Sequence, residues 1–287
     1  MTTMNLEQAP VRTWLPPDPT DPRPRFVDLL AAEWTKMRTV RSTFWALLAM
    51  VVISTALAWV ATAVMASQWD TLSAEDRAYL VADPVGLIFQ PAASYAQIAI
   101  CVLAVMAIAG EYSTGTMRTT LAAVPRRWPV VAAKAGVFAV VAFVATEIVA
   151  IGVYLLGRAY LSPHVEVGTD LRPILGFGLY LITIGLFALA LATVLRHVAG
   201  SITAVLALII VVPNVGSFLP GKWGEYASTY LPGGDGGQMI MSSGQNPGAV
   251  VTPWQGYGVL LAWAVAALVL AAVTLARRSA PPSRSAI

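Results

Sequence analysis

Long uncharged stretches divide the chain into six segments that are apolar enough to cross a lipid bilayer. A transmembrane helix needs about 20 apolar residues to cross about 30 Å of hydrocarbon. Glu147 is the only charged residue within the six segments. They are residues 43–66, 86–109, 135–156, 173–195, 200–219 and 257–276. The pattern predicts an all-α membrane protein with six transmembrane helices.

The composition agrees with this pattern. Of 287 residues, 57% are hydrophobic and only 11% are charged, whereas soluble domains carry about 25% charged residues. The missing polar surface is therefore expected to face lipid. The first 41 residues contain no apolar run typical of a cleavable signal peptide. Cys101 is the single cysteine, which excludes an intramolecular disulfide.

Lysine and arginine are distributed unequally between the connecting segments. An even number of spans places both termini on one side, and that side would hold fourteen of the 18 basic residues, namely Arg12, Arg23, Arg25, Lys36, Arg38, Arg41, Arg118, Arg126, Arg127, Lys134, Arg196, Arg277, Arg278 and Arg284. The other side would hold four, namely Arg77, Arg158, Arg172 and Lys222. Basic residues concentrate in cytoplasmic segments. We therefore expect a multi-pass protein of the cell membrane with both termini in the cytoplasm.

The ends of the chain differ from the apolar region between them. Residues 1–24 contain six prolines and no periodic pattern, which predicts a disordered cytoplasmic tail. We expect residues 25–279 to form a single six-span domain and residues 280–287 to form a second cytoplasmic tail.

An amphipathic helix is predicted directly before the first span. Phe26, Leu30 and Trp34 recur at helical spacing, and polar residues lie among them, namely Glu33, Lys36 and Arg38. Such a helix beside a span is typical of one that lies in the cytoplasmic membrane interface. The alternative is an ordinary cytoplasmic extension of the first span.

The segment from Gly110 to Lys134, between the second and third spans, is basic and rich in threonine. Pro125 and Pro129 limit any helix here to a short piece, about residues 114–123. Its arginines offer guanidinium groups to carboxylates of a soluble partner. The alternative is that they only retain the loop in the cytoplasm and bind anionic lipid.

The sequence carries few groups that could perform catalysis. It has no G-x-x-x-x-G-K-[ST], no H-E-x-x-H and no G-x-S-x-G motif, and only two histidines. We therefore expect no catalytic residue, no metal site and no cofactor bound by this chain.

The external segment of residues 220–255 is rich in aromatic residues and glycine, and short helices are expected there. They would form either a gating element or a structural belt.

Glu147 lies about two-thirds of the way along the third span. An ionisable group at such a depth costs about 2.5 kcal/mol or more unless it is partnered or hydrated. It would either line a polar translocation path or form a packing contact. Gln90 and Gln97 in the second span are the expected polar partners.

The loop sequence G-E-Y-S-T-G-T-M-R-T-T-L-A-A-V-P-R-R, which begins at Gly110, resembles the cytoplasmic loop of type-2 ATP-binding-cassette (ABC) permeases. That family's pattern is E-Y-x-x-G-T-[IML]-R-x-x-L followed by P-x-R. The segment A-A-E-W-T-K-M-R-T-V-R-S-T before the first span and Y-L-P-G-G-D-G-G-Q before the last span are similar to the same family. The resemblance covers about residues 26–278.

The resemblance implies the transmembrane subunit of an ABC exporter, for a solute of a lipid-like, drug or peptide class. Two such subunits, identical or paired with a sister permease, would assemble in membrane lipid with two cytosolic ABC ATPases, which would hold ATP and Mg²⁺; no nucleic acid is implied. The loop would contain a coupling helix that transmits ATPase movement to the spans. The coupling residues would be Glu111, Tyr112, Gly115, Thr116, Arg118, Thr119, Arg126 and Arg127. Glu147 matches no part of the family pattern.

Two other functions are consistent with the residues alone. One is an ATPase-independent secondary carrier that uses Glu147 as its proton site. The other is a membrane enzyme or a sensor scaffold that transports nothing. Co-purification of an ATPase would separate the exporter from both.

Overall fold

A computed structural model describes residues 25–124, 128–243 and 250–277. The two predicted tails, Arg126 and Arg127 lie outside the described residues, and so does the side chain of Arg118. The described part is helical and contains no strand. Its elements are α1 Phe26–Thr39, α2 Arg41–Ser67, η1 Trp69–Thr71, α3 Ala74–Ala82, α4 Pro84–Thr114, α5 Thr116–Ala123, α6 Trp128–Leu161, α7 Leu171–Leu195, α8 Val198–Leu206, η2 Ala207–Val211, α9 Val212–Ser217, α10 Lys222–Tyr230, α11 Asp235–Gln238, η3 Met239–Met241 and α12 Pro253–Arg277.

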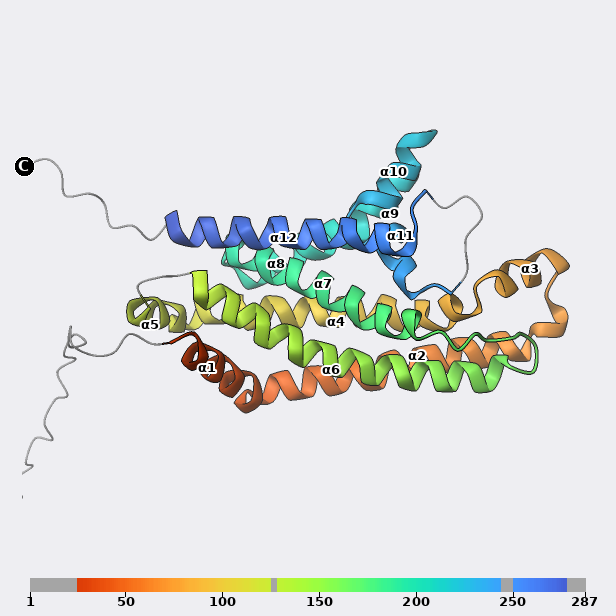
Figure 1. Ribbon diagram of the computed structural model, residues 1–287, viewed down its shortest axis with the longest axis horizontal. Helices are drawn as coiled ribbons and strands as arrows, with labels where there is room; N and C mark the ends of the chain where they lie inside the picture. The colour runs from red at the N-terminus through yellow and green to blue at the C-terminus, as the bar shows by residue number, and fades with distance from the viewer. Residues whose placement is uncertain (1–24, 125–127, 244–249, 278–287) are drawn as a thin grey trace, which may run out of the picture.

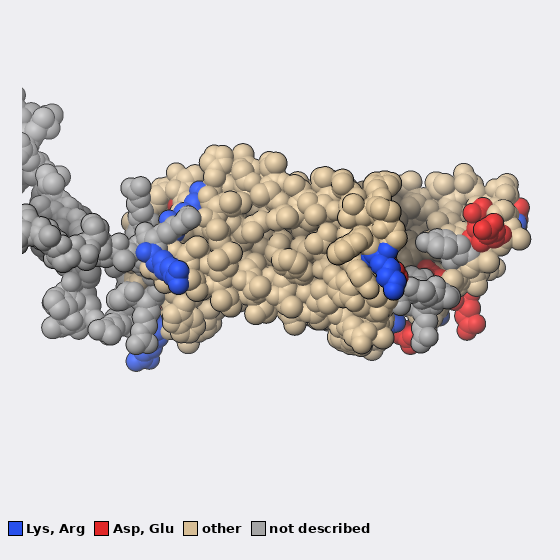
Figure 2. Space-filling view, turned by 90° about the horizontal axis from the view of Figure 1, so that it is seen from above, with Lys and Arg blue, Asp and Glu red and all other residues tan. Residues whose placement is uncertain are grey.

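The six predicted spans are confirmed as six helices that are long and apolar enough to cross a membrane. Five are single helices, namely α2, α4, α6, α7 and α12, and the other runs from α8 through η2 to α9. They lie side by side as an elongated bundle (Figure 1). Figure 2 shows charged side chains gathered toward the two ends of one face, with an uncharged belt between them. The chain is therefore a multi-pass membrane protein.

The second and third spans are longer than the apolar segments that predicted them. α4 has 31 residues and α6 has 34, which correspond to about 46 and 51 Å at about 1.5 Å per residue. Both helices therefore extend beyond about 30 Å of hydrocarbon. Glu111 and Tyr112, which the sequence placed in a loop, lie in the last turn of α4.

α4 and α7 form the buried centre of the bundle, and the other spans surround them. Phe89 on α4 packs against Phe177 on α7, with ring centroids 5.3 Å apart. Glycines allow other close contacts: a Cβ added to Gly185 would lie 2.7 Å from the ring of Phe138, and one added to Gly157 would lie 2.5 Å from Ile88. Small residues at such positions let transmembrane helices approach closely.

The two ends of the bundle carry different short helices. α1 and α5 lie at one end, and α3, α10 and α11 lie at the other (Figure 1). α10 and α11 are the short helices predicted before the last span, whereas α3 was not predicted. Between α4 and α5, Gly115 has a φ of 77°. A left-handed residue ends the α-helix and redirects the chain, so α5 begins as a separate helix.

The helix of the fifth span is irregular at its centre. η2 is a π-helical turn over Ala207–Val211, and Pro213 follows in α9. A proline has no N–H for the carbonyl four residues before it, here that of Ile209. Gly233 packs directly on this carbonyl, since a Cβ added to Gly233 would lie 2.1 Å from the Ile209 oxygen. The segment that precedes α11 therefore packs against the irregular part of the fifth span.

Candidate functional site

A cluster of four charged side chains, Glu33, Lys36, Glu111 and Lys134, joins α1, α4 and α6. Lys134 Nζ lies 2.6 Å from Glu33 Oε2 and 2.8 Å from Glu111 Oε1. Lys36 Nζ lies 2.6 Å from Glu33 Oε1 and 3.0 Å from Glu111 Oε1. Two acidic and two basic groups leave no net charge. We call these residues the charge cluster.

Most of the charge cluster is shielded from solvent. The side chains of Lys134, Glu33 and Glu111 are 5%, 6% and 13% exposed, and that of Lys36 is 34% exposed. Lys134 Nζ also donates to the Ala107 carbonyl at 3.3 Å. Because a buried charge that loses its partner is strongly unfavourable, the cluster fixes α1 against the ends of α4 and α6.

The pKa of Lys36 reflects these contacts. Burial alone would lower the pKa of this ammonium, but its hydrogen bonds to Glu33 and Glu111 outweigh that effect and raise the pKa. Lys36 therefore remains charged at neutral pH and keeps α1 joined to α4.

The structure places Glu33 differently from the sequence prediction. The sequence placed Glu33 with Lys36 and Arg38 on the polar side of an interfacial helix, but Glu33 is the buried residue of α1. Phe26 and Trp34 are instead 45% and 46% exposed. The reason is that the ammonium of Lys134, on a different helix, needs a carboxylate, and Glu33 supplies it.

Further contacts connect the start of α5 to the rest of the bundle. The guanidinium carbon of Arg196, in the turn after α7, lies 5.3 Å from the ring centroid of Tyr112. Met117 on α5 is 1% exposed and packs in the core, whereas Thr116 and Thr119 are exposed. α5 is thus attached to α1, α6 and α7 through the end of α4, and its threonines face outward.

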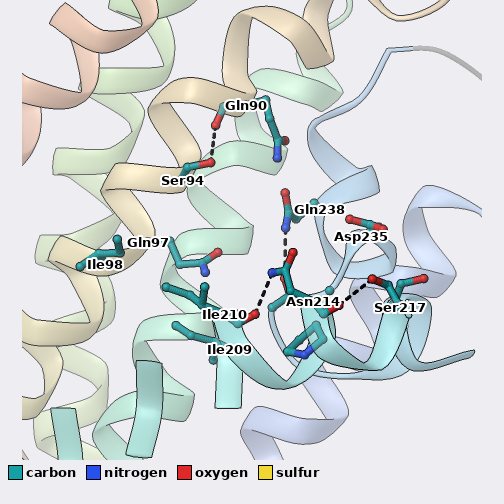
Figure 3. A pocket seen from close by; sticks show the side chains of 14 residues that line it. Gln90, Ser94, Gln97, Ile98, Ile209, Ile210, Asn214, Ser217, Asp235 and Gln238 are labelled. Carbon is teal, nitrogen blue, oxygen red and sulfur yellow. Dashed lines mark hydrogen bonds between the residues drawn. The ribbon is translucent and has the colours of Figure 1, made fainter. Parts of the chain in front are cut away.

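A polar cavity lies toward the opposite end of the bundle, between α4, η2–α9 and α11 (Figure 3). We call it the amide cavity, and its volume is about 360 Å³. Eight of its lining side chains are polar, namely Gln90, Ser94, Gln97, Asn214, Ser217, Ser228, Asp235 and Gln238. The lining includes no Lys, Arg or His among the described residues.

Hydrogen bonds orient the amides that line this cavity. The hydroxyl of the fully buried Tyr180 donates to Gln97 Oε1, which directs the Gln97 NH₂ group toward the cavity. Asn214 Nδ2 donates to the Ile210 carbonyl at 2.7 Å, and Gln238 Nε2 donates to the Gly233 carbonyl at 3.1 Å. The side-chain oxygen of each of these two amides is left to accept a hydrogen bond, and one N–H of each is left to donate.

A second cavity of about 420 Å³ adjoins the amide cavity and shares Gln90, Asp235 and Gln238 with it. Asp83 lies on its wall. Asp83 Oδ1 accepts hydrogen bonds from the Ser243 N–H and hydroxyl, both at 2.9 Å, and from the Gly86 N–H at 3.0 Å. Burial raises the pKa of Asp83, but these hydrogen bonds and one from Ser242 outweigh it and lower the pKa. Asp83 thus holds residues 242–243 against the start of α4.

The three residues proposed to line a pathway do not lie together. Gln90 and Gln97 line the amide cavity, whereas Glu147 lines neither cavity. Glu147 Oε1 is buried without a hydrogen-bond partner among the described residues, and a Cβ added to Gly178 would lie 2.1 Å from it. Gly178 and Tyr180 project about 200° apart on α7. α7 therefore separates Glu147 from the glutamines that were expected to be its partners.

Sequence reasoning missed several cavity residues. Ser94 follows Gln90 by four residues and precedes Gln97 by three, so a polar stripe at helical spacing was readable within the second span. The polar Asn214, which follows Pro213 within the fifth span, was a second indication of a polar site in the sequence. Asp235 and Gln238 reach the cavity only through the fold of the segment before α12, which no local pattern reveals.

No protein-family model matches the chain, and no curated protein is significantly similar to it. The class that the structure defines is a multi-pass membrane protein with six apolar helices, two groups of short helices at its ends and a polar cavity beside the second and fifth spans.

Proposed function

We propose that this chain is the transmembrane permease subunit of an ABC exporter, which moves its solute with energy from a separate cytosolic ATPase. The observation that carries the proposal is the position of the E-Y-S-T-G-T-M-R-T-T-L segment. It forms the end of α4, the left-handed Gly115 and the short α5. These residues present exposed threonines on a helix that is joined to three other helices.

This arrangement is suited to transmit force. A displacement of α5 acts on the end of α4, where Glu111 is paired with Lys36 and Lys134 and Tyr112 contacts Arg196. α1, α6 and α7 would therefore move with α5. Glu111 has the role of connecting helices within the chain, rather than the direct ATPase contact that the resemblance implies.

The exposed polar residues beside the amide cavity support a dimeric pathway. Gln90, Ser94, Asn214 and Ser217 are exposed although they lie in apolar spans. Polar groups at membrane depth are unfavourable against lipid and generally face protein or water. A second copy or a sister permease would cover this side, and the solute would pass between the two bundles.

The same proposal assigns the orientation. The end with α1 and α5 would lie in the cytoplasm, where the basic residues predict it, and the amide cavity would lie toward the outer face. α1 would lie along the inner surface with Phe26 and Trp34 toward lipid.

The test is the composition of the complex purified from the native membrane through a tag on this chain. We expect an ATP-hydrolysing subunit in equal amount. Thr119→Trp on α5 should displace it, because Thr119 is exposed there. Thr39→Trp on α1 is the matched control, since both hydroxyls donate to their own helix at 2.8 Å. Absence of the ATPase from the purified complex would contradict the proposal. Equal amounts of ATPase with Thr119→Trp and with Thr39→Trp would also contradict it.

A further inference from the structure

Hydrogen-bond acceptors outnumber donors in the amide cavity. The hydroxyls of Ser94, Ser217 and Ser228 donate to the carbonyls of Gln90, Asn214 and Glu225 at 2.9, 2.6 and 3.1 Å. Their oxygens are therefore left to accept. The side-chain oxygens of Asn214 and Gln238 are also acceptors, and one N–H of each NH₂ group is bonded to a backbone carbonyl while the other stays a donor.

Asp235 adds a negative charge to this acceptor-rich surface. Its side chain is exposed at the start of α11, between the two adjoining cavities. This side chain forms no ion pair and no hydrogen bond with any described residue. No lysine, arginine or histidine lines either cavity among the described residues, so no group in either lining would neutralise an anionic ligand.

The volume and the lining residues of the cavity further restrict the class of ligand that it can bind. A volume of about 360 Å³ lies near the lower end of the range for ligand pockets, which favours a small molecule over a two-chain lipid. Among the described residues no aromatic ring lines the amide cavity, so they offer no cation–π site of the kind that binds quaternary ammonium groups. An ammonium that carries its own N–H donors matches the acceptors instead.

From this geometry we infer that the amide cavity binds a small polyhydroxylated primary amine, with the ammonium on Asp235 and the hydroxyls on the amide and serine oxygens. The inference deepens the proposed function, because it names the class of solute, and it rests on that function only in calling the ligand a transported one. The Gln97 NH₂ group supplies a donor for a ligand hydroxyl. Phosphorylated and carboxylated solutes are disfavoured.

The test is equilibrium binding to the purified full-length chain in lipid nanodiscs, without any ATPase. The probes are glucamine, sorbitol and sorbitol 6-phosphate, which share a polyhydroxylated chain and differ in charge. Glucamine should bind about ten- to a hundredfold more tightly than sorbitol, because a hydrogen bond to a charged group is stronger than a neutral one. Sorbitol 6-phosphate should bind most weakly.

Asp235→Asn should bring the affinity for glucamine close to that for sorbitol. Asp170→Asn is the matched control, since Asp170 is exposed and lines neither cavity, and it should keep the preference. Equal binding of glucamine and sorbitol by the unmodified chain, a preference for the phosphate, a preference that persists in Asp235→Asn, or no binding of any probe overturns the inference. Because no ATPase is present, these results are independent of whether the chain couples to one.

Discussion

Removal of Lys134 from the charge cluster should release α1 from the bundle. In Lys134→Met, the carboxylates of Glu33 and Glu111 share the single ammonium of Lys36. One buried negative charge is then uncompensated. Lys134 and Glu33 are 5% and 6% exposed, and breaking a buried ion pair costs about 3–5 kcal/mol. Lys36 is 34% exposed, so Lys36→Met should cost about 1 kcal/mol, because solvent screens its contacts.

Hydrogen exchange of the α1 amides measures this effect in the intact protein. A loss of 3–5 kcal/mol in local opening free energy corresponds to about two to nearly four orders of magnitude in exchange rate. The double variant Glu33→Gln/Lys134→Met provides the control, because Glu111 and Lys36 remain as a neutral pair. The α1 amides of this double variant should exchange more slowly than those of Lys134→Met alone.

Three results would exclude this role of Lys134. The first is α1 exchange that Lys134→Met leaves unchanged. The second is an equal effect of Lys36→Met and Lys134→Met. The third is a double variant that is less protected than Lys134→Met, since that would mean that the buried charges do not compensate one another.

Three further predictions concern other parts of the chain. Gly115→Ala should lower stability by about 1–2 kcal/mol, because its φ is 77°, whereas Gly110→Ala, equally free of neighbours, should not; equal melting temperatures would contradict this. The lowered pKa of Asp83 means that its charge stabilises the fold above about pH 3.9. That stability should be lost as pH falls through the folded-state pKa, and Asp83→Asn should flatten the pH dependence of the melting temperature below neutrality; an unchanged profile would contradict it. Gly178→Ala should destabilise the protein and Glu147→Ala should restore it, because a Cβ at position 178 would lie 2.1 Å from Glu147 Oε1; failure of Glu147→Ala to compensate would contradict this contact.

The spans could be predicted from the sequence because each depends on a local property. An uninterrupted apolar run such as residues 173–195 has few alternatives to a membrane-spanning helix. The ends of α4 and α6 could not be located in the same way. Glu111 and Lys134 lie beyond the apolar runs, and they are accommodated within helices only because each has an oppositely charged partner on another element.

The candidate site was less predictable, because it depends on contacts between distant residues. Helical spacing placed Glu33 beside Lys36, but it could not reveal Lys134, which lies 101 residues further along the chain. Gln97 was recognised as a polar residue within a span, yet its partner is Tyr180 rather than Glu147. A tyrosine in an apolar run is usually a packing residue, so no local pattern singles out Tyr180.

We propose that an ATPase drives transport through this chain by way of α5. The most direct measurement is solute export in proteoliposomes that contain the purified complex, with glucamine as the first solute. We expect transport that requires ATP hydrolysis, is lost in Thr119→Trp and is retained in Thr39→Trp. Transport by the chain alone, driven by a proton gradient and abolished by Glu147→Gln, would exclude the ABC exporter and identify a secondary carrier.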